Sequence, residues 1–87
     1  MPGVGRPATL TLVSPLISPS LSAQETTVLV GYVSGLTLAS AARRAGVRLG
    51  TAKQYLDRVK RKYESAGRPA RTKLELAARA REDGLLG

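Results

Sequence analysis

Apolar residues recur at helical spacing in four separate stretches of the chain. The first stretch follows Ser22 and Glu25, whose spacing is typical of a capping box at a helix N-terminus. Its apolar positions repeat with a helical period, at Val28, Leu29, Tyr32, Val33 and Leu36. This pattern predicts a helix over residues 23–34 that stops at Gly35.

The second stretch is short and rich in alanine. Thr37 is the predicted N-cap, residues 38–45 form the helix, and Gly46 ends it. The side predicted to face inward consists of Ala41, Ala42 and Ala45. Because steeply crossing helices approach closely only where side chains are small, this segment predicts a helix packed tightly against its neighbours.

The third stretch predicts a longer, amphipathic helix that starts at Leu49 or Gly50 and continues to Glu64. Its apolar arc, roughly 100° wide, is sufficient to bury against a core; it holds Ala52, Tyr55, Leu56, Val59 and Tyr63. The opposite arc is polar and mostly basic, and holds Lys53, Gln54, Asp57, Lys60 and Arg61.

A fourth helix is predicted within residues 71–83, after Gly67 and Pro69 interrupt the pattern. Its buried side is predicted to hold Leu74, Ala77, Ala78 and, beyond the helix, Leu85. Leu76 and Ala80 form a second apolar strip, to which the pattern assigns no internal partner.

Residues 1–20 have a different composition, rich in Pro, Gly, Ser and Thr with Arg6 as their only charge. This is typical of a flexible arm or linker. The chain is therefore predicted to be all-α, with an N-terminal arm over residues 1–20 and a four-helix domain over residues 21–87.

Composition excludes several kinds of chemistry. The 87 residues include no Cys and no His, which removes disulfides, thiol nucleophiles, zinc clusters and histidine acid–base catalysis. The six carboxylates form no convincing pair within an apolar region. We expect neither an enzyme nor a bound metal or cofactor, and no small-molecule substrate is evident.

Charge points to a polyanionic partner. Fourteen Lys and Arg residues against six Asp and Glu give a net charge of +8, and most of the cations lie in residues 43–73. A membrane partner is disfavoured, because the apolar face beneath these charges carries small residues and Tyr, and its size fits a core. No apolar run approaches the ~20 residues of a spanning helix. Pro15 and Pro19 break the one stretch similar to a signal peptide, so a cytoplasmic location is expected.

A small-residue helix, a glycine-containing turn and a basic amphipathic helix together predict a helix-turn-helix. The ordered motifs from Leu21 to Leu86 resemble the LuxR/GerE-type DNA-binding domain of bacterial transcription regulators. The resemblance is carried by "LSAQETTVL", by "AGV" in the turn, by "TAKQY", and by "RT…GLL" around the fourth helix. Gly35, Thr37, Ala42, Val59 and Lys62 also match the family pattern.

The chain departs from the family pattern at several positions. Ser40 stands where the second helix usually has Glu, and Tyr55 where the third usually has His. Arg48 replaces the serine that caps the third helix, so a later start with Gly50 as N-cap is the alternative. The segment between Tyr63 and Arg71 is longer than the family's loop.

The resemblance implies that the third helix enters the major groove of DNA, with Lys53, Gln54 and Asp57 at the base edges. Their chemistry suits this role, since Lys donates to guanine, Gln bonds bidentately to adenine, and Asp accepts from the cytosine amino group. For Asp57, the alternative is an intrahelical ion pair with Lys53 or Arg61.

Phosphate contacts are expected from Thr37, Arg48, Thr51, Arg58, Arg61 and Lys62. For Arg43 and Arg44, the alternative to a phosphate contact is a simple solvated charge. The family generally binds DNA as a dimer through the fourth helix, which here predicts a homodimer interface at Leu76 and Ala80 with Lys73 at its rim. The alternative for this strip is an ordinary apolar surface patch.

Two other functions remain open from the sequence. One is a domain similar to sigma-factor region 4, with promoter DNA and RNA polymerase as partners, although a fourth helix ending in "GLL" argues against it. The other is a helical module that binds an acidic protein through the same basic face.

Overall fold

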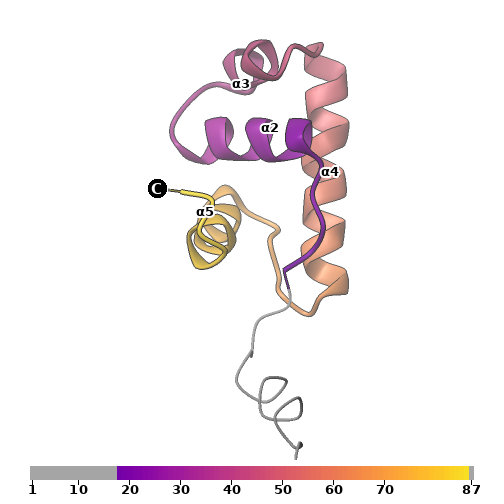
Figure 1. Cartoon of the computed structure of the whole chain (residues 1–87), viewed down its shortest axis with the longest axis vertical. Coiled ribbons are helices and arrows are strands. Elements are labelled where there is room, and N and C mark those ends of the chain that lie inside the picture. The colour runs from indigo at the N-terminus through magenta and orange to yellow at the C-terminus, as the bar shows by residue number, and fades with distance from the viewer. Residues whose placement is uncertain (1–17, 87) are drawn as a thin grey trace, which may run out of the picture.

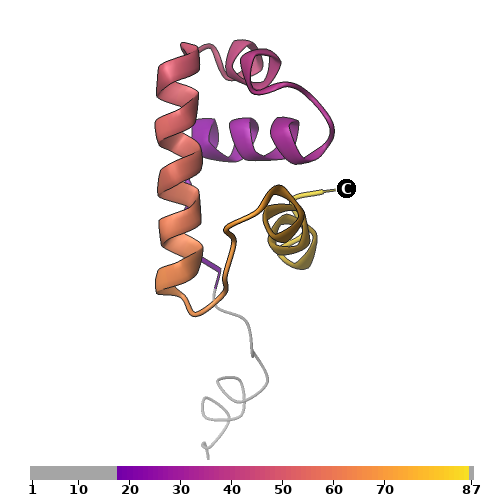
Figure 2. The same ribbon diagram turned by 180° about the vertical axis from the view of Figure 1, so that it is seen from behind.

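The computed structural model describes residues 18–86 and is all-helical over that range. Its elements are α2 (Ala23–Val33), α3 (Leu38–Ala45), α4 (Leu49–Ser65) and α5 (Lys73–Glu82). In Figures 1 and 2, α4 runs along the length of the domain while α2 crosses it, with α3 and α5 on either side of α2. The predicted all-α, four-helix class is confirmed. No described helix has the length and apolar character needed to cross a membrane.

Local sequence signals explain where the first two of these helices begin and end. The Ser22 hydroxyl accepts a hydrogen bond from the Glu25 backbone N–H at 3.1 Å, and the Glu25 carboxylate accepts one from the Ser22 backbone N–H at 2.9 Å. This is the predicted capping box. Thr37 caps α3 as predicted, and Gly46 ends it with a φ of 72°, in the left-handed region that favours glycine.

The close approach of α2 and α3 depends on small side chains at their crossing. A Cβ added at Gly31 would lie 3.2 Å from the Cβ of Ala41. Ala41 and Ala42 are themselves buried, as the alanine-rich pattern predicted. α2 contacts all three other helices, and this crossing therefore anchors the centre of the domain.

Helix α4 begins at Leu49, two residues earlier than it would with Gly50 as its N-cap. Arg48 occupies the N-cap position and its side chain makes no capping hydrogen bond. The suggestion that Gly50 is the N-cap is therefore wrong, because backbone helical geometry extends past it without a side-chain cap. The predicted apolar arc is confirmed: Ala52, Leu56, Val59 and Tyr63 are buried, and Tyr55 is half-buried at its edge.

The prediction for the fourth helix is wrong about which side is buried. Leu76 and Ala80 are completely buried, whereas Leu74 is 83% exposed. Helix α5 starts with a second capping box, formed by Thr72 and Glu75, and presents Leu76 and Ala80 to the core one turn apart. Both apolar strips of α5 consist of Leu and Ala, so their composition does not distinguish them.

A buried polar cluster joins the lower end of α4 to α5. The Tyr63 hydroxyl donates to Asp83 at 2.7 Å, and the Arg68 guanidinium donates to Asp83 at 2.7 Å and to Glu82 at 2.9 Å. Burial and the neighbouring Asp83 carboxylate raise the pKa of Tyr63 above its ordinary range. The connection between α4 and α5, residues 66–72, carries Arg68 into this cluster.

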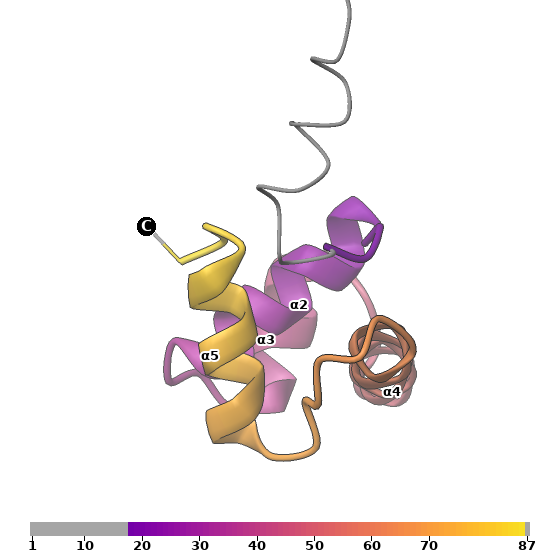
Figure 3. The same cartoon turned by 90° about the horizontal axis from the view of Figure 1, so that it is seen from below.

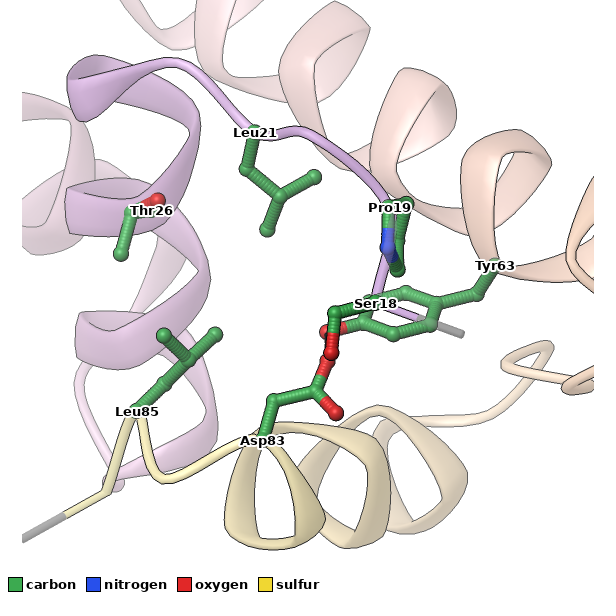
Figure 4. A pocket seen from close by; sticks show the side chains of 7 residues that line it. All are labelled: Ser18, Pro19, Leu21, Thr26, Tyr63, Asp83 and Leu85. Carbon is green, nitrogen blue, oxygen red and sulfur yellow. Dashed lines mark hydrogen bonds between the residues drawn. The ribbon is translucent and has the colours of Figure 1, made fainter. Parts of the chain in front are cut away.

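The last three residues of the predicted arm lie against the domain, and residues 1–17 lie outside the described range. The Lys62 ammonium donates to the Ser20 carbonyl at 2.8 Å, and the Ser18 side chain hydrogen-bonds to Asp83. The described contacts with the domain thus begin before Leu21. This segment borders a shallow hollow of about 180 Å³, which Pro19, Leu21 and other residues line (Figure 4).

Candidate nucleic-acid interface

One side of α4 carries no neighbouring helix. Figure 3 shows α4 end-on, with α2, α3 and α5 all to one side of it. The three residues predicted to contact bases, Lys53, Gln54 and Asp57, are exposed, and so are Arg58 and Arg61. The buried stripe on the opposite side holds the helix against the core. The sequence prediction that this flank of α4 faces outward is confirmed.

Asp57 stands without a protein partner on this face. No described cation lies within ion-pair distance of its carboxylate, so the intrahelical pair with Lys53 or Arg61 does not form. The other described acidic residues pair with cations or, in the case of Glu75, cap a helix. Among the carboxylates of the described range, Asp57 is therefore the one that is free to accept hydrogen bonds from a bound partner.

Positive charge is concentrated around the turn between α3 and α4. The sequence holds no acidic residue between Glu25 and Asp57, and the cations in that interval are Arg43, Arg44, Arg48 and Lys53. All four are exposed and make no ion pair with a described residue. The carboxylates that neutralise cations elsewhere lie near the lower end of α4 and on α5, so the surplus charge remains at this turn.

The residues predicted to contact phosphates fall into different environments. Arg48, Arg58 and Arg61 are exposed, and the Arg58 guanidinium lies 5.8 Å from the centroid of the Tyr55 ring. Thr51 is half-buried in the first turn of α4. The exposed Thr37 uses its hydroxyl within the protein, accepting from the Ser40 backbone N–H and donating to the Ser40 hydroxyl, both at 3.1 Å.

Lys62 requires a correction, because its ammonium is engaged inside the domain. Its Nζ lies 2.7 Å from a Glu25 carboxylate oxygen that is almost fully buried, and 2.8 Å from the Ser20 carbonyl. Burial acts to raise the pKa of Glu25, but hydrogen bonds from Lys62 and Ser22 outweigh it and hold that pKa below its ordinary value. Lys62 is thus a structural cation rather than a free phosphate ligand.

The predicted dimer contacts also require a correction. Leu76 and Ala80 are buried in the core of a single chain, so they offer no surface to a second one. Lys73 is exposed, with its Nζ 4.6 Å from the centroid of the Tyr32 ring. The apolar surface of α5 is carried instead by Leu74, with the half-buried Ala77 and Ala78 on the same side.

Sequence reasoning missed one contact beside this face. Tyr55 was predicted to be a core residue, but its hydroxyl donates to the Gln24 side-chain oxygen at 3.1 Å. The available signal was the position of Tyr55 at the border of the apolar arc, where an aromatic residue with a polar tip reaches the surface.

The remaining features offer little ligand chemistry. In the hollow beside Pro19 (Figure 4), Asp83 already accepts hydrogen bonds from Tyr63 and Arg68, and the Thr26 hydroxyl donates to the Ser22 carbonyl. Within residues 18–86, no group of acidic side chains could hold a metal ion. The basic face of α4 and the adjoining turn is therefore the candidate site.

Comparisons with known proteins identify no relative: no family model, no curated protein and no solved structure matches the chain.

Proposed function

We propose that this protein binds double-stranded DNA in a sequence-specific manner, as a bacterial transcription regulator of the LuxR/GerE type. The observation that carries the proposal is the exposed side of α4, where Lys53, Gln54 and Asp57 project from a helix whose opposite stripe is buried. A rigid helix of 17 residues with one open side suits insertion into the major groove.

The charges around α4 support a DNA partner in two ways. The unpaired cations at the turn and on α4 supply a sequence-independent attraction to phosphates. Asp57 opposes that attraction, since a carboxylate is repelled by the DNA backbone, and it is useful on this face only if it accepts from a base such as cytosine. In this proposal the arginines position α4 while Lys53, Gln54 and Asp57 discriminate between sequences.

A homodimer through α5 forms part of the proposal, with Leu74 replacing the residues expected from the sequence. Leu74 is the most exposed large apolar side chain of the described range, and Ala77 and Ala78 beside it allow a second helix to approach closely. Two copies of α4 in a symmetric dimer would meet half-sites about one helical turn apart. Sedimentation of wild type and Leu74→Asp measures this step, and an unchanged monomer–dimer equilibrium would contradict it.

The test of the main proposal is selection of binding sites from a random duplex pool by the full chain. We expect an enriched motif, bound at least about a thousandfold more tightly than a scrambled duplex. Lys53→Ala and Asp57→Ala should each change the enriched bases. Equal binding to selected and scrambled duplexes would refute sequence-specific binding.

A second candidate is an acidic protein partner, which includes an acidic surface of RNA polymerase. Leu49 favours it, because this side chain is 45% exposed and follows Arg48 directly. An apolar side chain beside cations suits an amphipathic acidic segment better than it suits phosphates. Binding to a protein in the absence of any sequence preference for DNA would support this candidate.

A further inference from the structure

Two consecutive residues at the start of α2 hold α4 at two points. Gln24 accepts a hydrogen bond from the Tyr55 hydroxyl at 3.1 Å, and Glu25 accepts one from the Lys62 ammonium at 2.7 Å. Tyr55 and Lys62 are seven positions apart, which is about two helical turns, so they lie along the same edge of α4. The two contacts therefore lie one above the other along a single edge of α4, parallel to its axis.

That edge separates the buried stripe of α4 from its open side. Tyr55 and Lys62 are both half-buried, between the buried Leu56 and Val59 and the exposed Arg58. Contacts at the border of a helix resist its rotation about its own axis more effectively than contacts beneath it, because rotation moves the border toward or away from its partner.

Apolar packing alone controls this rotation weakly. The hydrophobic effect is non-directional, whereas hydrogen bonds weaken steeply as their geometry departs from linear. A rotation of about 20° moves side-chain tips about 5 Å from the helix axis by roughly 2 Å. Such a displacement is enough to break a hydrogen bond to a base edge.

One of the two holding residues, Glu25, is itself fixed. The Glu25 carboxylate that binds Lys62 also accepts from the Ser22 backbone N–H, so it forms part of the capping box of α2. It is only 3% exposed. The Ser20 carbonyl adds a second acceptor for Lys62. A rigid helix end thus faces the edge of α4.

We propose that Gln24 and Glu25 are positioning residues that set the rotation of α4, and so determine whether Lys53, Gln54 and Asp57 meet the base edges in register. The inference rests on the proposed DNA-binding function. Gln24 and Tyr55 control the upper half of α4, where the predicted base contacts lie, and Glu25 and Lys62 control the lower half. The role is one of orientation rather than of direct DNA contact.

The Gln24–Tyr55 contact permits a clean test, because it is exposed to solvent and contributes little to folding. Tyr55→Phe keeps the ring that packs beside Arg58 and removes only the hydroxyl. Gln24→Ala removes the acceptor. Thr27→Ala is the matched control, since Thr27 is an exposed residue of α2 whose hydroxyl donates only to the Ala23 carbonyl.

For each full-length variant, we would measure the affinity ratio between the selected duplex and a scrambled duplex, together with urea unfolding. We expect Tyr55→Phe and Gln24→Ala each to lower the ratio by about three- to tenfold. The double variant should lose no more than either single one, because both remove the same contact. Affinity for the scrambled duplex, the unfolding midpoint and the Thr27→Ala ratio should stay unchanged. An unchanged ratio, or losses that multiply in the double variant, would overturn the proposal.

A second measurement, without DNA, separates failure of this inference from failure of the proposed function. Residual dipolar couplings of backbone amides vary periodically along a helix, and the phase of that variation reports its rotation. We expect the phase for α4 relative to α2 to change in Tyr55→Phe and Gln24→Ala but not in Thr27→Ala. An unchanged phase refutes the positioning role even if the wild type selects DNA, whereas a changed phase with no selection by the wild type refutes only the DNA-binding function.

Discussion

Replacing each leucine of α5 with alanine should affect stability very differently at the two positions. Leu76 is completely buried, so Leu76→Ala removes its transfer free energy and leaves a cavity, at a cost of about 3 kcal/mol. Leu74 is 83% exposed, and Leu74→Ala should change the free energy of unfolding by about 0.5 kcal/mol or less. The same chemical change, two residues apart in one helix, therefore serves as its own control.

The loss of stability in Leu76→Ala can be measured because the domain is small. A domain of this size is stable by only about 4–10 kcal/mol, so the loss at Leu76 takes a large share of the total. With a urea m-value near 1 kcal/mol/M, the unfolding midpoint should fall by about 3 M in Leu76→Ala and by about 0.5 M or less in Leu74→Ala.

Urea unfolding of the full chain, followed by circular dichroism, is the assay. It should be repeated at several low protein concentrations, because self-association through Leu74 would make the midpoint concentration-dependent. If Leu74→Ala proves the more destabilising change in dilute monomer, the orientation of α5 described above is wrong.

Four further outcomes follow from the charged and titratable side chains. Lys62→Met should lower the free energy of unfolding by about 1–2 kcal/mol. This loss is smaller than for a fully buried ion pair, because Lys62 is 38% exposed. Arg61→Met should leave urea unfolding unchanged but make the salt dependence of DNA binding shallower by about one unit of slope. The pKa values of Glu25 and Asp83 lie below their ordinary values, so the stability they contribute is present at neutral pH and should be lost as the pH falls below about 4, measurable as acid unfolding. The pKa of Tyr63 is raised, so the stability that its protonated hydroxyl contributes is present up to about pH 10 and should be lost as the pH rises further. The check is whether phenolate absorbance appears together with unfolding. Ionisation of Tyr63 in the folded protein would contradict the prediction.

Much of the fold could be predicted because its signals are local. The capping box of Ser22 and Glu25, the N-cap at Thr37 and the left-handed Gly46 each act within a few residues, and each appears where the sequence indicates. The apolar arc of α4 is also local, because side chains three and four positions apart share a side of any helix. The exposure of Lys53 on the opposite side follows from it.

The functions of several charged residues could not be predicted in this way. Lys62 lies at the edge of the apolar stripe of α4, and only the tertiary structure brings Glu25, 37 positions away, to 2.7 Å from it. The same holds for Tyr55 and Gln24, which are 31 positions apart. A sequence pattern records the polarity of each side chain but not the residue it meets across the fold.

Helix α5 separates the two kinds of information most clearly. Its helical period and its cap at Thr72 are encoded locally, but it carries two apolar strips of similar composition. Burial of Leu76 rather than Leu74 depends on the direction in which the chain enters α5. The ion pair between Arg68, which precedes the helix, and Asp83, which follows it, is one of the long-range contacts that hold α5 in place. Local periodicity can define the sides of a helix, whereas the path of the whole chain decides which side meets the core.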